Sequence, residues 1–475
     1  MIWKTAWKNI WRNPVRSIIV IASVTIGIFA GVFSVAFMNG MIAQRFDSAI
    51  DEEISHIQVT GRDFSLNNDP GIIIRDADHL IDSVSSIHGI ESYAERILVN
   101  GMAQTASRSE GVEIAGIDPE RERKVFDLYK KIIPGTGSFF EKQSKYDLAL
   151  IGQDLAKDLN IIRYSIDSVS LAKLASKGIP ARVTTLLKAL EGRRFSGEKK
   201  FEKTLTGLLD KKDAEEFGSA IKEAAWSFRE NSKVTLTFLD RNSNQVSAAF
   251  RVAGIYDIKN SSFEQTMVFV RDESLRRLAG FDSGSFHQLI IRISDIGYTE
   301  DITGKIRSAF PGYEVRNWKE LQPDLAMMTD YVHQIYGIFM SIILAALAFG
   351  IINTMLMAVL ERTRELGMLA AIGMNRKRIF TMIMLESVFL SITGGLTGMM
   401  AGWLSVLVTS SHGINFSQYS EGMEAIGYSA HVYPVISAGF FLLVTILIIF
   451  TGIISSVYPA FKALKLDPAE AIRTE

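Results

Sequence analysis

The sequence predicts an α-helical membrane protein with four transmembrane helices and a large α+β extracytoplasmic domain between helices 1 and 2. Four apolar stretches exceed the roughly 20 residues that cross the hydrocarbon core of a bilayer as a helix. A single charged residue, Glu386, interrupts them. The first two stretches are separated by a polar region, residues 44–334, which is larger than a typical single domain.

The hydropathy pattern gives the expected boundaries. The first apolar stretch is longer than the roughly 7–15 residues of a signal-peptide core, so we expect a retained helix rather than a cleaved signal. The segments are an N-terminal segment (1–16), transmembrane helices (17–43, 335–360, 379–409 and 435–459), the extracytoplasmic domain (44–334), a charged segment (361–378), a loop (410–434) and a tail (460–475).

Positive charges flank the predicted helices on one side. They gather at both termini and in the 361–378 segment, whereas the 410–434 loop holds no Lys or Arg. Cytoplasmic loops carry the excess of Lys and Arg, so we expect a multi-pass protein of the inner (cytoplasmic) membrane with both termini in the cytoplasm and the large domain in the periplasm. The cations are Lys4, Lys8, Arg12, Arg16, Arg362, Arg364, Arg376, Lys377, Arg378, Lys462, Lys465 and Arg473.

Composition excludes several classes of function. The net charge is −1, whereas a nucleic-acid-binding protein carries a dominant basic surface. The absence of cysteine excludes a thiol nucleophile, and the seven histidines show no metal-ligand spacing. Gly192 and Gly197 have the spacing of a phosphate-binding loop, but Glu198 stands where that loop needs lysine. We therefore expect no catalytic site, metal site or cofactor in this chain, and a structural role for His56.

Two similar β-α-β patterns stand at the ends of the extracytoplasmic domain. One occupies residues 55–118 and the other residues 287–318, each with the alternating apolar residues of half-buried strands. Together they predict one split subdomain, with residues 119–286 inserted as a second subdomain. Residues 161–231 within this insertion have the pattern of helices and form a predicted helical insert.

The charged segment at 361–378 contains a short predicted helix with one apolar face. Gly373 is placed to end it in a left-handed conformation. Such a helix suits docking into a groove on another protein, but its arginines equally suit a linker held by lipid headgroups, and the residues alone favour neither. The apolar face and the ionic groups at its start are Leu366, Leu369, Ile372, Arg362, Arg364 and Glu365.

Two features lie inside the third predicted transmembrane helix. Gly394, Gly398 and Gly402 form a small-residue stripe that permits close helix packing. Glu386 is ionisable, and such a residue in a transmembrane helix is a candidate for function. We interpret it as a structural or coupling group near the cytoplasmic interface rather than as a proton carrier.

Three stretches resemble the FtsX/MacB-type (type VII) permease superfamily of ABC transporters. They are KNIWRNPVRSIIVIASVTIGI, INTMLMAVLERTRELGMLAAIGMNRKRIFTMIMLES and YPAFKALKLDPAEAIRTE. The order of one helix, a large outer domain and three further helices is also similar. The resemblance implies that residues 361–378 form the coupling segment on the ATPase, and that the outer domain has the Porter and Sabre subdomains of the family. The 161–231 insert has no counterpart in the family pattern, and its role is open.

The resemblance also implies partners. The chain has no Walker motif, so ATP and Mg are expected on a separate ABC ATPase in two copies, beside a second permease, identical or homologous. SVAFMNG and SHIQVTG resemble the lipoprotein-releasing (LolC/LolE-like) permeases. This implies extraction of lipoproteins from the inner membrane, with membrane lipids around the helices and a periplasmic carrier or adaptor as a further partner. MacB-like export of small molecules or peptides and FtsX-like signalling to an envelope hydrolase are the alternatives.

Large flexible apolar side chains gather at the outer ends of the first two predicted helices. Met and Phe form adaptable surfaces, so a pair of permeases would have a substrate cavity for acyl chains there; ordinary helix packing is the alternative. The residues are Phe33, Phe37, Met38, Met41, Phe339, Met340 and Ile343.

Overall fold

The computed structural model describes residues 2–74, 77–140, 144–176, 178–195 and 197–465. The chain forms two compact units. The helical unit contains Met1–Arg45, Asp324–Ser420 and Ser429–Glu475, and the sheet unit contains Phe46–Pro323 and Glu421–Tyr428. Residues 466–475 of the predicted tail, Arg473 among them, lie outside the described residues.

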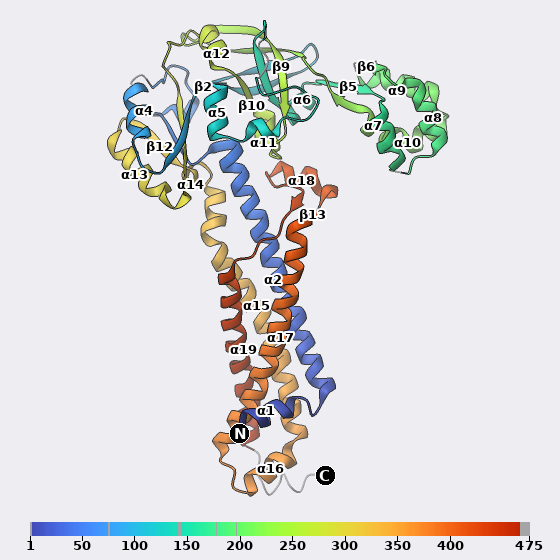
Figure 1. Ribbon diagram of the computed structural model, residues 1–475, viewed down its shortest axis with the longest axis vertical. Helices are drawn as coiled ribbons and strands as arrows, with labels where there is room; N and C mark the ends of the chain where they lie inside the picture. Colours follow the sequence, from blue (N-terminus) through green and yellow to red (C-terminus); the bar gives the residue numbers. More distant parts are fainter. Residues whose placement is uncertain (1, 75–76, 141–143, 177, 196, 466–475) are drawn as a thin grey trace. The chain divides into compact units, whose positions relative to one another are not determined.

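Among the described residues, four long apolar helices form the helical unit and confirm the predicted fold class (Figure 1). Each runs beyond at least one of its predicted boundaries, because hydropathy does not assign polar end residues to a helix. They are α2 (Pro14–Ser48, continued by the π-helix η1, Ala49–Ile54), α15 (Pro323–Glu361), α17 (Arg376–His412) and α19 (Ala438–Leu464). The short elements of this part are α1 (Ile2–Ile10), α16 (Thr363–Ala371), β13 (Ile414–Asn415), η5 (Ser417–Tyr419), α18 (Ser420–Ala425) and β14 (His431–Val432).

Glycines bring α17 close to α2. A Cβ atom added at Gly394 would lie 2.7 Å from Val24 of α2. One added at Gly398 would lie 2.7 Å from the carbonyl oxygen of Thr25. Gly402 faces α2 in the same way. The predicted glycine stripe therefore lies at the contact of α17 with α2, where any larger side chain would push the helices apart.

Nine strands form a curled sheet in the sheet unit, in the order β12-β1-β11-β2-β3-β10-β4-β9-β8. The long strand β2 also pairs with β8, so six of these strands close into a ring. The β3–β10 and β4–β9 pairs are parallel and the others antiparallel.

The strands of this sheet are β1 (Ile57–Gly61), β2 (Ile90–Gln104), β3 (Ser109–Ile117), β4 (Leu148–Gly152), β8 (Lys233–Leu239), β9 (Gln245–Tyr256), β10 (Met267–Arg271), β11 (Gln288–Ile293) and β12 (Tyr313–Asn317). The short helices beside it are α3 (Phe64–Asn67), α5 (Pro119–Val125), η2 (Leu128–Lys131), α6 (Gln153–Asp158), α11 (Ser261–Thr266), α12 (Asp272–Ala279), η4 (Ile296–Tyr298) and α14 (Trp318–Leu321).

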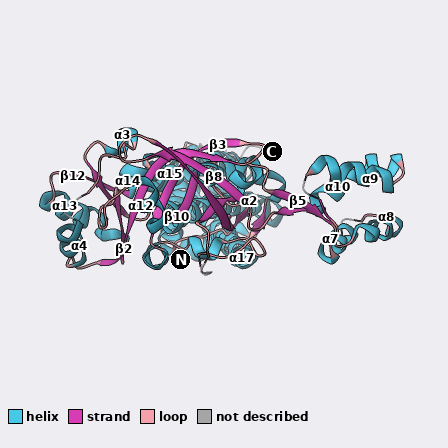
Figure 2. Cartoon of the chain, turned by 90° about the horizontal axis from the view of Figure 1, so that it is seen from above, coloured by secondary structure: helices cyan, strands magenta, loops and turns pink. Residues whose placement is uncertain are grey.

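Elements from the two ends of the sheet unit share one core. The order β12-β1-β11-β2 alternates strands of the first β-α-β pattern with strands of the second. Two helices, α4 (Ala77–Ser85) and α13 (Thr299–Ala309), pack against these strands, with Leu80 and Ile306 fully buried (Figure 2). Neither half has a complete core without the other, as a split subdomain requires.

Residues 161–231 fold around a core of their own, in which Phe201 and Ile221 are fully buried. The insert contains helices, and a three-stranded sheet, β6-β5-β7, accompanies them. Ile161 and Phe228 belong instead to the core of the large sheet. The elements are β5 (Ile162–Ser165), α7 (Ser168–Ser176), α8 (Ala181–Leu187), η3 (Lys188–Leu190), β6 (Arg194–Phe195), α9 (Glu198–Leu208), α10 (Lys211–Ala225) and β7 (Trp226–Phe228).

Candidate functional site

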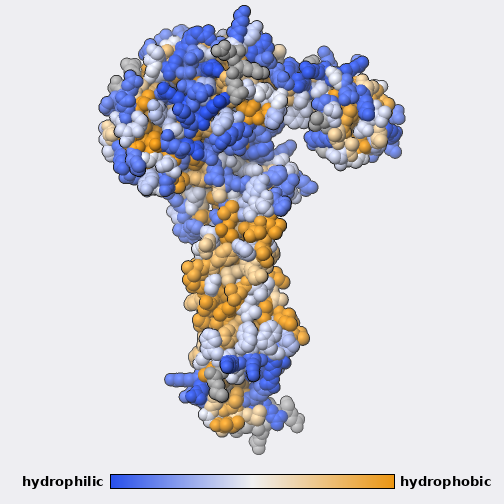
Figure 3. All heavy atoms as spheres, in the orientation of Figure 1, coloured by the Kyte–Doolittle hydropathy of each residue, from blue (hydrophilic) through white to orange (hydrophobic). Residues whose placement is uncertain are grey.

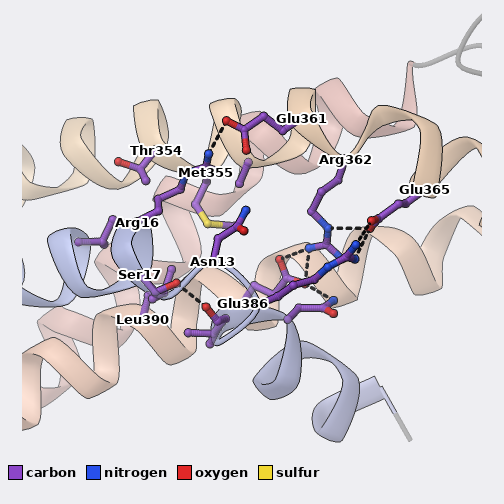
Figure 4. Close-up of a pocket in the computed structure, with 15 residues that line it drawn as sticks. Asn13, Arg16, Ser17, Thr354, Met355, Glu361, Arg362, Glu365, Glu386 and Leu390 are labelled. Atoms are coloured by element: carbon purple, nitrogen blue, oxygen red, sulfur yellow. Dashed lines mark hydrogen bonds and ion pairs between the residues drawn. The ribbon is translucent and has the colours of Figure 1, made fainter. Parts of the chain in front are cut away.

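A layer of paired charges crosses one end of the helical unit (Figure 4). It begins where α1 turns into α2 and the hydroxyl of Ser17 donates to the carbonyl oxygen of Ile10 (2.5 Å). This corner directs Asn9 toward α17, and Arg12 and Arg16 toward α16 and α15. A cavity of about 190 Å³ opens among these side chains.

Glu386 lies at the centre of the layer. The side-chain amide of Asn9 donates to one carboxylate oxygen of Glu386 at 2.6 Å. The guanidinium of Arg362 lies 3.2 Å from both oxygens. Glu386 is only 6% exposed, and a buried carboxylate needs such partners to remain in the fold. The carboxylate therefore joins α1, α17 and the residue that follows α15.

A second carboxylate extends the layer to α16. Arg362 donates to Glu365 at 3.2 Å, and Arg12 pairs with the same carboxylate. Partial burial raises the pKa of Glu365, but the guanidinium groups of Arg12 and Arg362 outweigh it and hold that pKa below its ordinary value. Arg16 pairs with Glu361 at the end of α15. The charges thus alternate along the layer and tie α16 to the helices around it.

Glu386 lies near the start of α17, about three turns from its first residue. Ten residues of α17 precede Glu386, which corresponds to about 15 Å of helix. In the part of α17 that precedes Glu386, Phe380 packs on Phe461 of α19, with 5.3 Å between the ring centroids. Figure 3 shows hydrophilic residues in a band at the α1 end of the long helices and apolar residues again beyond it. Glu386 therefore belongs to a layer of paired charges near the start of α17.

The structure separates the predicted apolar face of α16 into two faces. Leu366 is 5% exposed within the core of the helical unit, and Leu369 packs against that core. Ile372 is 85% exposed and Met368 is 46% exposed. Leu366 and Leu369 are therefore corrected from docking residues to core residues. Sequence spacing defines the faces of a helix but does not reveal which face turns toward its neighbours.

One face of α16 points outward. Arg364, Met368 and Ile372 are exposed and spaced four residues apart, so they follow one side of the helix and its end. Gly373 has a φ of +94°, the left-handed conformation in which glycine commonly ends a helix. Past it, Arg376, Lys377 and Arg378 are exposed. The outward face thus combines two apolar side chains with a border of cations.

The predicted substrate residues do not line one open surface. Met340 is fully buried, and Met340 and Ile343 lie against Gly31 of α2, so these two are corrected to packing residues. Met38 and Phe339 are exposed. Phe33, Phe37 and Met41 are half-buried, with Phe33 stacked on Phe29 and Phe37 in contact with Phe416.

A second candidate site, within the sheet unit, holds the end of the first long helix. The π-helix η1 carries three consecutive acids, and each has a partner from a distant segment. Asp51 pairs with Arg292 at 2.8 Å, and the buried Glu52 pairs with Lys131 at 2.6 Å. Glu53 accepts from the side chain of Gln322 at 3.2 Å. The run of acids was readable in the sequence, but its partners were not, because they lie far away along the chain.

Two buried histidines serve the sheet unit structurally. The Nδ1 atom of His287 accepts from the backbone N–H of Leu98 (3.0 Å), so the ring proton is on Nε2, 3.1 Å from the carbonyl oxygen of Pro70. Burial lowers the pKa of His287, and also that of His56, to about 4. Within the described ranges, no group of three His, Asp or Glu side chains is placed to hold a metal ion.

Four spanning helices with one large domain inserted after the first define a class of polytopic membrane protein, and comparison with known proteins identifies the family. Residues 337–468 match the family model described as FtsX-like permease C-terminal, and residues 17–201 match the MacB-like periplasmic core domain. The chain belongs to the FtsX/MacB-type (type VII) ABC transporter permease superfamily.

Three curated relatives show what the chain is similar to. The chain is 33% identical over 34% of its length to the uncharacterised ABC transporter permease YknZ of Bacillus subtilis, covering 37% of that protein. It is 30% identical over 36% of its length to the macrolide export ATP-binding/permease protein MacB of Chlorobium luteolum, covering 23%. It is 21% identical over 48% of its length to the lipoprotein-releasing system transmembrane protein LolC of Xylella fastidiosa, covering 55%. The matches thus span only part of each relative.

Proposed function

We propose that this chain is the permease subunit of an ATP-driven transporter and that it carries motion from a separate ATPase to the large domain. The observation that supports this most is the two-sided α16. Its inner side is fixed by Leu366 and by the ion pairs of Glu365, while Met368 and Ile372 face outward. A force applied to the outward face would therefore reach α1, α15 and α17 rather than deform a loose loop.

The proposed path continues through two helices. α15 is unbroken over 39 residues, about 58 Å, from the charged layer to Pro323. α2 ends in the η1 segment, whose acids are bound by side chains of the sheet unit. Both ends of the path are thus held by specific polar contacts. Motion of α2 or α15 along its axis would pull on the sheet unit.

We assign the cytoplasmic side to the end that carries α1 and α16. Exposed cations gather there, and the positive-inside rule places such an end in the cytoplasm. The sheet unit is then on the periplasmic side of the inner membrane, and both termini are cytoplasmic. ATP and Mg belong to the partner ATPase, which docks on α16 from the cytoplasm.

An exposed apolar stripe on α15 supports pairing with a second permease. From Met328 to Ile342 the spacing alternates between three and four residues, the repeat of two helices packed along a seam, and Phe349 follows one full repeat of seven residues later. At about 58 Å, α15 exceeds the hydrocarbon core by far, so the stripe continues outside the bilayer, where it needs a cover. The residues are Met328, Tyr331, Ile335, Ile338, Ile342 and Phe349. Two permeases with two ATPases follow as the proposed assembly.

We propose lipoproteins as the substrate, in keeping with the similarity to LolC. Each CH₂ group of an acyl chain costs about 0.8 kcal/mol on leaving hydrocarbon. Extraction therefore needs an apolar path that begins in the outer leaflet, and ATP-driven work. The exposed Met38 and Phe339, with the α15 stripe beyond them, offer such a path between two permeases. A periplasmic carrier or adaptor would then receive the substrate.

Photo-crosslinking tests the substrate. Crosslinkers at Met38, Phe339 and Tyr331 should capture a lipoprotein without ATP and lose it on hydrolysis. Matched controls at the buried Met340 and at Trp403, an exposed residue of α17, should not. Capture of phospholipid alone, with a soluble peptide or drug captured by the sheet unit, would contradict lipoprotein release and favour export of the MacB kind.

A further inference from the structure

Three stripes of side chains run along α1. Ala6 and Ile10 are buried in the core of the helical unit. Trp3 and Trp7 are exposed and spaced four residues apart, and Trp11, just past the end of the helix, continues their stripe. Lys4 and Lys8 form a third exposed stripe beside the tryptophans. The helix is therefore amphipathic, with an aromatic side and a cationic side left uncovered.

The tryptophan stripe lies against α17. Trp3 and Trp7 pack edge-on against Phe389 of α17, with ring centroids 5.1 Å and 5.7 Å apart. Phe389 is three residues, about 4.5 Å, further along α17 than Glu386, on the membrane side of the charged layer. Tryptophans at this level lie where headgroups meet acyl chains, the region in which Trp is enriched.

The lysine stripe is a free cationic surface at the same level. Arg12 and Arg16 are taken by Glu365 and Glu361. In the part of the chain that the structure describes, Lys4 and Lys8 form no ion pair, and no acid precedes Asp47 in the sequence. Charge complementarity at the membrane surface therefore points to an anionic partner.

We propose that α1 is a binding surface for anionic phospholipid headgroups, contacted by Lys4 and Lys8 while Trp3, Trp7 and Trp11 enter the headgroup boundary. Interfacial helices bind in this way, through buried apolar area together with cations. The binding does not depend on the proposed transport function. The effect of this binding on transport does rest on the proposed function. Asn9 of the same helix donates to Glu386, so lipid binding to α1 would set the position of the charged layer.

Hydrogen exchange of the full chain in nanodiscs tests the cationic side. Each lysine near an anionic surface contributes about 1 kcal/mol, so backbone amides of residues 2–12 should exchange at least about tenfold more slowly in anionic than in zwitterionic nanodiscs. Lys4→Gln with Lys8→Gln should remove this difference. The control Lys211→Gln with Lys212→Gln, two exposed lysines of α10, should keep it. Exchange that is independent of headgroup charge would overturn the proposal.

Spin labels test the aromatic side, and the absence of native cysteine makes single labels simple. Labels at positions 3 and 11 should be more accessible to oxygen, which partitions into lipid. Labels at positions 4 and 8 should be more accessible to a water-soluble nickel complex. Equal access of water to both stripes would overturn the proposal, because α1 would then lie away from the bilayer. Neither measurement requires the ATPase, so failure here is distinguishable from failure of the proposed transport function.

Discussion

Arg362 and Glu386 form an ion pair in which one guanidinium nitrogen, Nη1, lies 3.2 Å from both carboxylate oxygens. The pair joins the end of α15 to α17, and Asn9 adds α1 to the same carboxylate. Removing one partner from a buried pair costs about 3–5 kcal/mol, far more than loss of an exposed pair. The charged layer therefore holds α16 in a fixed orientation relative to the spanning helices.

Exchanging the charges of Arg12 and Glu365 tests whether the layer transmits force. Arg12→Glu alone places two acids together and should uncouple ATP hydrolysis from transport by tenfold or more. Adding Glu365→Arg should restore part of the coupling, because the pair with position 12 is re-formed with reversed sign, while Arg362 loses this carboxylate and keeps Glu386. The measurement is substrate moved per ATP hydrolysed. A double variant no better than the single one would contradict a direct pairing.

Gly398 should tolerate no side chain. Its added Cβ would lie 2.7 Å from a backbone oxygen of α2, so Gly398→Ala should destabilise the helical unit by about 1–3 kcal/mol. Gly350→Ala in α15 is the matched control, because its Cβ would meet nothing within 4 Å. It should be neutral or stabilise by up to about 1 kcal/mol. Equal melting temperatures for the two variants in detergent would contradict the close α2–α17 contact.

Glu264 should make the sheet unit less stable as pH rises. It is 2% exposed, and burial together with the charge of Asp257 raises its pKa to about 8. The folded state therefore keeps a proton that the unfolded state loses above its ordinary value of 4.5. The stability that protonated Glu264 contributes is fully present below about pH 4.5 and is lost as the pH rises to about 8. Between pH 7 and pH 8 the free energy of unfolding should fall by about 1 kcal/mol.

The variant Glu264→Gln keeps an oxygen to accept the backbone N–H groups of Ile258 and Lys259. It should lose this slope and melt at a higher temperature than the parent at pH 8. The histidines do not interfere, because their depressed pKa values affect stability between about pH 6.5 and pH 4. An unchanged pH dependence of melting in the variant would show that Glu264 is ionised in the fold.

The insert should be removable if the deletion takes out its own core and leaves the core of the large sheet intact. Tyr164 and Trp226 face each other across β5 and β7. Replacing residues 165–225 with Asn-Gly should close a hairpin between them and leave a folded, membrane-inserted permease that binds its ATPase. The wider excision of 161–231 removes Ile161 and Phe228 from the large core and should fail to fold. Equal loss of folding in both variants would make the insert part of the main core.

Local signals explain what the sequence could predict. The spanning helices follow from runs of apolar residues, and the split subdomain follows from alternation in each strand. The fold class depends on both kinds of signal, because it combines apolar helices with a domain built on a sheet.

Distant pairing explains what the sequence could not predict. Asn9 and Glu386 are 377 residues apart, and no periodicity connects them. The inward turn of Leu366 depends on how α16 packs against the bundle, which its own spacing does not contain. The strands β5 and β7 are short and lie at either end of a helical stretch, so their pairing emerges only in the folded insert.

Docking of the ATPase on the outward face of α16 can be tested by co-purification. Ile372→Asp with Met368→Asp places two charges in the proposed interface, which should cost several kcal/mol of binding. The permease should still insert, and the ATPase should no longer co-purify. Leu186→Asp, at an exposed leucine of the insert, is the control and should keep the ATPase. Normal co-purification with the α16 variant would contradict the assignment of α16 as the coupling helix.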